Sequence, residues 1–225
     1  IDAKDRYTRE HSQRVAEYSR LIADYMRGGC ASGEELELIY RSGLLHDIGK
    51  IAVSDAVLNK PERLTDEEYE VMKKHTVWGR EILSGLEFLP QADLGATYHH
   101  ERYDGSGYPY HMSGQRIDVF ARYIAIIDAY IAMASPRTYR NALTPLQILG
   151  NFEKSLDKYD VELLMPIMKR IADAQIGTSV ELNDGSIWEV LIIHPNKYSR
   201  PILKNDKNEF VDLLQRPDLE IVKNV

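Results

Sequence analysis

The stretch Gly43-Leu44-Leu45-His46-Asp47-Ile48-Gly49-Lys50 decides the fold of this chain. Leu36, Ile39 and Tyr40 precede it at helical spacing, so the segment is predicted to be a buried helix. Burying an imidazole and a carboxylate side by side is costly unless something compensates both groups. A metal ion is one compensator, and an ordinary His46–Asp47 hydrogen bond inside a core is the other. The choice depends on whether further ligand-type residues converge on this dipeptide.

Length and composition restrict the class of protein. With 225 residues, 44% of them hydrophobic, the chain can bury one large core, or one core plus a small appendage. No apolar run approaches the roughly 18 residues that a membrane span needs, and no secretion leader is recognisable, so a cytoplasmic, bacterial location is expected. The single cysteine, Cys30, suits a reducing compartment. A net charge of −7 argues against a nucleic-acid polymer as partner, so an anionic substrate would need a local cationic pocket.

Two histidines lie on the apolar faces of predicted helices. His11 shares its face with inward apolar residues of a helix predicted over residues 5–26. His75 lies on the apolar stripe of a helix that Thr65 opens, with Glu68 three residues on as a capping box. Each histidine alone is more simply a hydrogen-bonded core residue than a metal ligand. Two such coincidences make that simpler interpretation harder to sustain.

Further ligand-type residues follow. His99 and His100 lie at the end of a helix that begins after Pro90, and a glycine-rich loop over residues 101–109 comes next. Asp128 lies in the middle of an almost continuous apolar helix predicted over residues 119–134. A carboxylate in such a helix needs a cation or several hydrogen bonds, because an unpaired buried charge is expelled or neutralised.

The residue pattern changes from helix-like to strand-like near residue 176. Before it, Pro145 is predicted to start one helix, and the last helix begins near Asp160, with Pro166 expected to kink or split it. After it, strand-like segments flank the turn signal Asn183-Asp184-Gly185-Ser186. The fold is therefore predicted to be mainly α, a helical bundle over residues 1–175 with a small β-rich extension over residues 176–225.

Five of the seven histidines and two aspartates fall on inward faces or at ends of predicted helices. Two adjacent metals that share a bridging carboxylate need about this many nitrogen and oxygen ligands. Because each residue would otherwise need a separate explanation, the set favours a metal centre over core histidines. Its members are His11, His46, Asp47, His75, His99, His100 and Asp128.

The motifs in this set resemble those of the HD-GYP domain, a bacterial branch of the HD phosphohydrolases. The resemblance extends over roughly residues 4–173, and the C-terminal strands are similar to extensions seen behind such domains. It implies an HD-type helical bundle. The matching segments are Tyr7–Ser12, His46–Lys50, His75, the stretch His99–Pro109, Asp128 and Arg137–Arg140.

The resemblance also implies roles for individual residues. Lys50, beside the bridging Asp47, would contact the scissile phosphate. The nucleotide phosphates would be held by Tyr108, Arg137 and Arg140. The plainer interpretation of Tyr108 is an aromatic residue that only packs against its neighbours. The plainer interpretation of the two arginines is that they lie in a solvated loop. One metal would be bound by His11, His46, Asp47 and Asp128, and the other by His75, His99 and His100, with Asp47 shared.

The implied function is hydrolysis of cyclic di-GMP to pGpG, by a hydroxide held between two divalent metals, and a further step to GMP is left open. Imidazole and carboxylate ligands suit iron or manganese, and zinc would also bind. Two alternatives remain open: hydrolysis of another cyclic dinucleotide or of a nucleotide, and a non-catalytic cyclic di-GMP receptor or scaffold. The resemblance adds diguanylate cyclase domains as partners of the Gly-Tyr-Pro loop, and a homodimer.

The sequence departs from the family pattern at four positions. Tyr7 stands where members with a third metal carry glutamate, so two metals are expected. Ile131 replaces a usual aspartate that is not a ligand, which is expected to alter packing only. Ser54 and Glu62 replace a common proline and a common glycine, which affects loop shape and substrate preference.

Overall fold

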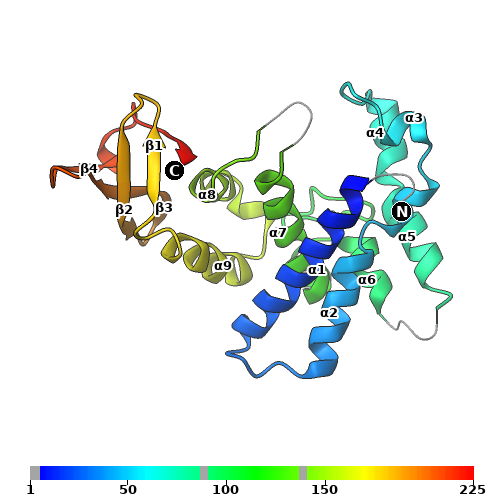
Figure 1. The fold of residues 1–225 in the computed structure, drawn as a ribbon. Coiled ribbons are helices and arrows are strands. Elements are labelled where there is room, and N and C mark those ends of the chain that lie inside the picture. Colours follow the sequence, from blue (N-terminus) through cyan, green and yellow to red (C-terminus); the bar gives the residue numbers. More distant parts are fainter. Residues whose placement is uncertain (1–5, 87–90, 137–140) are drawn as a thin grey trace. The chain divides into compact units, whose positions relative to one another are not determined.

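The structure, a computed structural model, describes residues 6–86, 91–136 and 141–225, and side-chain detail begins at residue 9 (Figure 1). Its contacts define two compact units. The first comprises residues 1–132 and 157–163, and the second comprises residues 133–156 and 164–225. Among the described residues, no helix is both long enough and apolar enough to cross a membrane.

The first unit is helical, as the sequence predicts. Its short 3-10 helices are η1 (Ile48–Ala52) and η2 (Gly114–Arg116), and η3 (Leu156–Lys158) straddles the boundary with the second unit. Its α-helices are α1 (Arg6–Met26), α2 (Gly33–Leu45), α3 (Asp55–Leu58), α4 (Asp66–Lys73), α5 (His75–Leu83), α6 (Ala92–Tyr98) and α7 (Val119–Ala134).

The core of this unit is built where α1 and α2 pack together and against α7. A Cβ atom on Gly43 of α2 would lie 2.9 Å from the Cα of Ala16 on α1, so these two helices approach as closely as their backbones allow. Val15 packs with Ile124, Ile127 and Ile131 of α7 in one fully buried cluster. Ile131, which replaces the family's aspartate, is thus an apolar core residue. This packing brings one end of α2 beside the middle of α7.

The segment between residues 65 and 83 is divided into two helices. The predicted capping box is present, since Thr65 accepts a hydrogen bond from the Glu68 amide and Glu68 accepts one from Thr65. α4 ends at Lys73 and α5 begins at His75, where a single helix was predicted. The division at Lys74 is a local change of hydrogen bonding, because Lys74 keeps right-handed helical dihedrals.

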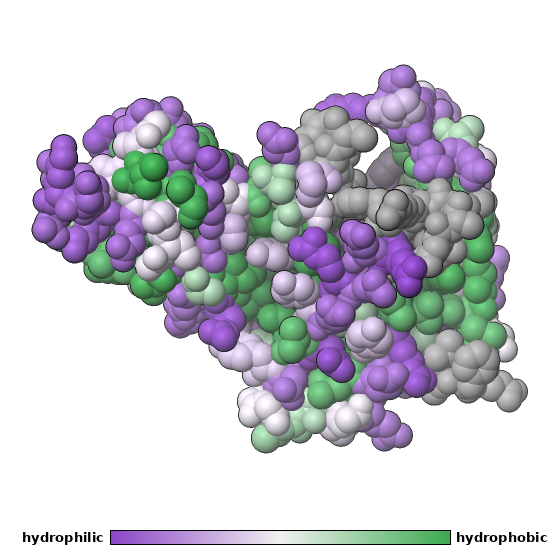
Figure 2. All heavy atoms as spheres, in the orientation of Figure 1, coloured by the Kyte–Doolittle hydropathy of each residue, from purple (hydrophilic) through white to green (hydrophobic). Residues whose placement is uncertain are grey.

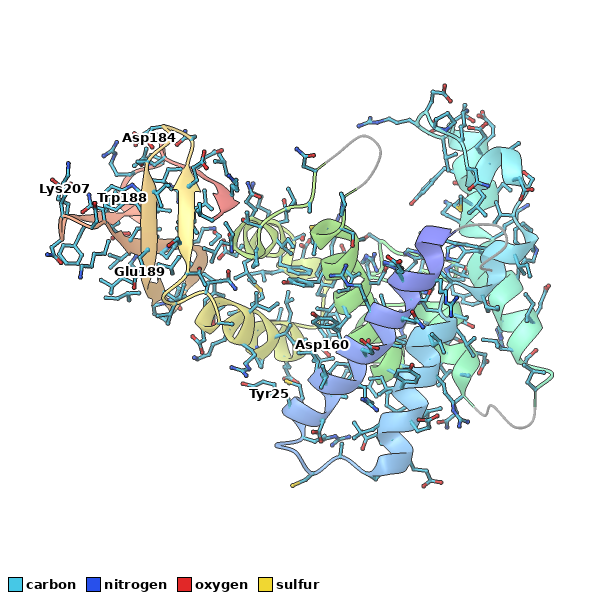
Figure 3. The ribbon with its side chains drawn as sticks, in the orientation of Figure 1. Tyr25, Asp160, Asp184, Trp188, Glu189 and Lys207 are labelled. Carbon is cyan, nitrogen blue, oxygen red and sulfur yellow. The ribbon has the colours of Figure 1, made fainter. Side chains whose placement is uncertain are left out.

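Residues 157–163 return to the first unit through an ion pair. Arg122 on α7 donates to Asp160, which Figure 3 labels, with 2.5 Å between Nη1 and Oδ2. Asp160 also accepts from the amide of Glu162 and so caps the start of α9 (Val161–Asp173). α9 continues through Pro166, so Pro166 does not divide the helix, and a kink at this residue stays a prediction. Proline at this position removes one helical hydrogen bond, and burial of the neighbouring Ile167 outweighs that loss.

The second unit holds α8 (Pro145–Glu153), the larger part of α9 and an antiparallel sheet in the order β4-β3-β2-β1-β5. The predicted hairpin joins β1 to β2, and in Figure 3 Asp184 lies at its turn while Trp188 and Glu189 lie on β2. Figure 2 shows a hydrophilic tip where residues 205–209 join β3 to β4. The strands are β1 (Ser179–Leu182), β2 (Ile187–His194), β3 (Lys197–Lys204), β4 (Phe210–Asp212) and β5 (Ile221–Asn224), and η4 (Leu213–Gln215) follows β4.

The helix α8 packs directly on this sheet. Its N-terminus carries the predicted proline and a capping box made by Thr144 and Gln147. The Gln147 side chain also donates to the carbonyl of Ile221 on β5 at 2.9 Å, and Glu153 accepts from the amide of Ser199 on β3 at 3.0 Å. The fold is mainly α with a small C-terminal sheet, as predicted. A domain boundary at residue 175 stays a prediction.

Candidate metal centre

His46 and Asp47 follow the last turn of α2, where they meet residues of α1 and α7. His11 of α1 lies 2.9 Å from Asp128 of α7, measured from Nε2 to Oδ1. The same Oδ1 of Asp128 lies 3.9 Å from Nε2 of His46. His11, His46 and Asp128 therefore present one ligand atom each to a common point, and all three ligand atoms lie within 4.8 Å of one another.

A second group of ligand atoms is formed by three histidines. Nε2 of His75, at the start of α5, lies 3.4 Å from Nε2 of His99, which follows α6. The ring of His100 lies 4.1 Å from that of His99 and 5.1 Å from that of His75, between centroids. One nitrogen from each of the three comes within 4.8 Å of the others.

Asp47 lies between the two groups and directs one carboxylate oxygen to each. Its Oδ2 is 3.3 Å from Nε2 of His46, and its Oδ1 is 3.5 Å from Nε2 of His75 and 3.8 Å from Nε2 of His99. Lys50 lies one turn further and places Nζ 2.6 Å from Oδ2. Asp47 is 2% exposed, so this carboxylate is shared among buried groups rather than solvated.

Backbone carbonyls orient three of the imidazoles. Nδ1 of His46 lies 2.7 Å from the carbonyl oxygen of Gly43, that of His75 is 2.7 Å from Met72, and that of His99 is 2.8 Å from Gly95. A carbonyl only accepts, so each Nδ1 carries the hydrogen. In a neutral ring Nε2 then holds the lone pair and points at the centre, which is the arrangement that metal-binding histidines use.

Electrostatics keeps the second group neutral. Burial lowers the pKa of His75 below its ordinary value and those of His99 and His100 well below it. A neutral imidazole is the form that binds a metal.

The carboxylates remain ionised despite their burial. Burial opposes ionisation of Asp47, but Lys50 and then His46 hold its pKa well below the usual range. For Asp128, burial is likewise outweighed by the hydrogen bond from His11, so its pKa is lowered. Burial also opposes protonation of His46, but the neighbouring Asp47 raises its pKa. A bound cation would replace that proton.

Two buried polar atoms that lack hydrogen-bond partners among the described residues also indicate that the residues fit a divalent metal. Within the part of the chain that the structure describes, neither Nε2 of His46 nor Oδ1 of Asp47 has a hydrogen-bond partner, although both are buried. A buried polar atom without a partner costs free energy comparable to a lost hydrogen bond, unless another group satisfies it. Both atoms point to the middle of the cluster, where a cation would satisfy them.

Gly49 brings the two groups together. A Cβ atom at Gly49 would lie 1.9 Å from the carbonyl oxygen of His75 and 2.5 Å from the amide nitrogen of Gly79. The 3-10 helix η1 therefore packs against α5 backbone to backbone. This contact sets the distance between Asp47, just before Gly49, and His75.

Tyr108 lies against the second group. Its ring stacks on His100 with 4.7 Å between centroids and 23° between planes. Its amide donates to the carbonyl of His100 at 3.2 Å. Burial raises the pKa of Tyr108, so the phenol keeps its hydrogen and can donate to an anionic ligand.

Sequence reasoning missed two residues that shape the Gly-Tyr-Pro loop. Glu101 is 2% exposed and accepts hydrogen bonds from the amides of Tyr110 at 2.7 Å and Met112 at 3.0 Å. Arg102 donates to the carbonyl of His99 at 3.1 Å, and its guanidinium lies 5.6 Å from the Tyr159 ring centroid. The signal that could have found them is a charged pair directly after two adjacent histidines at a helix end.

The structure brings all seven predicted metal ligands into one cluster, with Lys50 and Tyr108 beside it. Arg137 and Arg140 lie outside the described residues, and so does the side chain of Tyr7. Their predicted roles therefore stay predictions.

Comparison with known proteins agrees with this fold. Residues 1–163 match the HD domain family. The cyclic di-GMP phosphodiesterase response regulator RpfG of Xanthomonas campestris pv. campestris is 41% identical over 146 residues, covering 64% of this chain and 38% of that protein. The 3'3'-cGAMP-specific phosphodiesterase 3 of Vibrio cholerae is 36% identical over 156 residues, covering 69% of this chain and 33% of that protein.

A solved structure shares the fold. Bd1817, an HDG"Y"P protein from Bdellovibrio bacteriovorus, aligns with a TM-score of 0.58 at 16% identity, over 73% of this chain and 52% of that chain.

The chain belongs to the HD domain family, whose match takes in the whole candidate centre. Together with the curated relatives, this confirms the HD-GYP branch that the motifs predicted. The chain spans 38% and 33% of the length of the two relatives named above.

Proposed function

We propose that this chain is a metal-dependent phosphodiesterase that hydrolyses cyclic di-GMP to the linear dinucleotide pGpG. The observation that carries the proposal is the position of Asp47. Its two oxygens face two separate groups of imidazole and carboxylate ligands, and Nζ of Lys50 lies 2.6 Å from Oδ2. A carboxylate shared in this way is the arrangement that a pair of adjacent metals requires.

The proposed metal ligands follow from the two groups. His11, His46 and Asp128 would hold one divalent ion, and His75, His99 and His100 the other, with Asp47 bridging. When bound, such a pair lowers the pKa of water and polarises a phosphoryl group. A ligand set of imidazoles and carboxylates without thiolate suits iron or manganese, and also zinc.

The chain's own residues would bind and orient the phosphodiester. Lys50 is 26% exposed, so its ammonium can turn from Asp47 to a phosphate oxygen at the edge of the centre. Tyr108, kept protonated by burial, would donate a hydrogen bond to a second phosphate oxygen. Water adds to phosphorus, the bond from phosphorus to the 3′ oxygen breaks, and that oxygen leaves with a proton. The product carries a free 3′ hydroxyl and a 5′ phosphate.

A second substrate is supported by the relatives. RpfG is named for cyclic di-GMP, whereas the Vibrio cholerae phosphodiesterase is named for 3'3'-cGAMP. Both ligands contain the same backbone of two phosphodiesters and differ in one purine. A further step from pGpG to GMP, a homodimer, and diguanylate cyclase domains as partners remain predictions.

The test is metal analysis and product chromatography on protein purified without oxygen. Wild-type protein is expected to contain two metals per chain and to release pGpG from cyclic di-GMP. Asp47→Ala should lose metal and turnover together, because it removes a ligand from each shell. Lys50→Ala should keep its metals and lose about 10²–10³-fold in kcat, the usual cost of removing one donor to a developing charge.

The control is His194→Ala, since His194 lies in the second unit and pairs with Asp212 rather than with the centre. This variant should keep both metal content and turnover. Full metal content with normal hydrolysis in Asp47→Ala would refute the dinuclear assignment. Bound cyclic di-GMP without turnover in the metal-loaded wild type would favour a receptor.

A further inference from the structure

A row of aromatic rings leads from the candidate metal centre to the surface. Tyr108 stacks on His100, and Tyr69 of α4 lies beyond Tyr108, with 6.5 Å between centroids and 81° between planes. Tyr69 is 48% exposed, whereas Tyr108 is mostly buried. The outermost ring of the row therefore offers a solvent-accessible surface close to the centre.

A lysine accompanies these rings. Tyr69 and Lys73 are four residues apart on α4, so they share one face of the helix. Nζ of Lys73 lies 5.5 Å from the Tyr69 ring centroid and 5.7 Å from that of Tyr108. Lys73 also forms an ion pair with Glu70, whose side chain is 66% exposed. Such an exposed pair is worth little, so Lys73 remains available to another acceptor.

We propose that Tyr69 and Lys73 form a subsite for a purine base of the substrate, and that Lys73 favours guanine. This inference rests on the proposed function and names the part of the substrate that α4 would recognise. A base is joined to its phosphate through a single ribose. A phosphodiester held beside His100 can therefore place one base near Tyr108 and Tyr69, where an exposed aromatic ring and an ammonium group lie side by side.

The chemistry of the two residues matches the two parts of a purine. An aromatic ring stacks on any base, because every base has a π-face. An ammonium group only donates hydrogen bonds. Guanine presents O6 and N7 as two adjacent acceptors, whereas adenine presents N7 beside the donor N6. Tyr69 would thus supply affinity, and Lys73 would favour a substrate with guanine at this position.

The plainer interpretation is that both residues only cover Tyr108. The choice of substrate distinguishes this interpretation from the proposed subsite. A residue that acts by packing on Tyr108 affects every phosphodiester, including one without a purine. A residue that binds a base affects only dinucleotides.

The experiment compares Tyr69→Ala and Tyr69→Phe on metal-loaded protein with three substrates: cyclic di-GMP, 3'3'-cGAMP and methyl p-nitrophenyl phosphate. Tyr69→Ala should raise KM for both dinucleotides about 5- to 150-fold, the range that base stacking gives, with kcat little changed. Tyr69→Phe should restore the wild-type KM, because stacking needs only the ring. Turnover of methyl p-nitrophenyl phosphate should be unchanged. Tyr25→Ala is the matched control, since Tyr25 is a helical tyrosine of nearly the same exposure, 49% against 48% for Tyr69.

Lys73→Met tests selectivity. It should reduce the preference for cyclic di-GMP over cyclic di-AMP about tenfold, the worth of one good hydrogen-bonded base contact. Cyclic di-AMP is the substrate to compare because it carries adenine at both positions, whereas 3'3'-cGAMP can place its guanine in the subsite. Lys74→Met, at the exposed neighbouring residue, should leave the preference as it is.

Three outcomes would overturn the subsite. One is a Tyr69→Ala variant that hydrolyses dinucleotides with the wild-type KM. Another is an equal loss on methyl p-nitrophenyl phosphate, which would assign both residues to packing. The third is a wild-type protein that turns over no phosphodiester at all, which would remove the proposed function and the subsite together. The first two outcomes would overturn the subsite alone, because the wild-type protein would still hydrolyse cyclic di-GMP.

Discussion

Gly49→Ala is the sharpest test of how the centre is held together. Gly49 lies in η1 between Asp47 and Lys50, and a Cβ atom there would meet the His75 carbonyl oxygen at 1.9 Å and the Gly79 amide nitrogen at 2.5 Å. Real Cβ contacts essentially never fall below 3.0 Å, and these neighbours are backbone atoms that cannot rotate away. To remove this clash, η1 and α5 would have to move apart by about 1 Å, since a closely packed interior has no empty space that could accept the added methyl group.

The expected cost has two parts. Overpacking costs about 1–3 kcal/mol, and a clash with backbone belongs at the upper end, about 3 kcal/mol of unfolding free energy. Separation of η1 from α5 also moves Asp47 away from His75, now 3.5 Å distant, so the second metal should bind more weakly. A displacement of 1 Å in an active site can cost about 10²-fold in rate.

The assay is urea unfolding with metal analysis, on Gly49→Ala and on Gly33→Ala as control. Gly33 is the exposed first residue of α2, and a Cβ there would meet nothing within 4 Å. The control should match the wild type or gain up to about 1 kcal/mol from helix propensity. A Gly49→Ala protein with the wild-type urea midpoint and full metal content would refute the close contact between η1 and α5.

Four other expectations follow, the first two from the structure and the last two from the sequence. Chelation should lower Tm and added metal should restore it, because ions that bind only the folded state stabilise it by about 2.7 kcal/mol at hundredfold excess over Kd. An unchanged Tm would show that bound metals do not stabilise the folded protein. Glu101→Gln should cost about 1–2 kcal/mol in thermal unfolding, because the amide can offer only one acceptor atom to two backbone donors; full stability would show that the loop does not need this carboxylate. With Tyr7 in place of glutamate, anomalous density should show two metals rather than three. Arg137→Ala and Arg140→Ala should each weaken dinucleotide binding by about 1–3 kcal/mol with metal content unchanged, and equal affinities by calorimetry would place the phosphate clamp elsewhere.

The sequence by itself determined the elements and the candidate ligands. Helical periodicity predicts α7 with the bounds that the structure has, a capping box locates the start of α4, and Pro145 locates the start of α8. These features are local, since they depend on residues within a few positions of one another. The seven ligands were predicted because each polar group fell on an inward apolar face or at a helix end. That argument also needs only local spacing.

The local rules were wrong where packing outweighs them. Pro166 was expected to kink or divide α9, and the helix is not divided there, since its neighbours Leu164, Ile167 and Met168 are buried. The helix predicted from Thr65 onward is divided at Lys74, and no local breaker marks that point.

Only the tertiary structure decided how the ligands are shared. The two oxygens of Asp47 face His46 on one side and His75 on the other, and that division depends on how η1 crosses α5. The same crossing explains why residue 49 is glycine. The approach of Tyr69 to Tyr108 likewise joins segments 39 residues apart in the chain. Such distances are set by the packing of whole helices, and the spacing of residues along the sequence does not contain them.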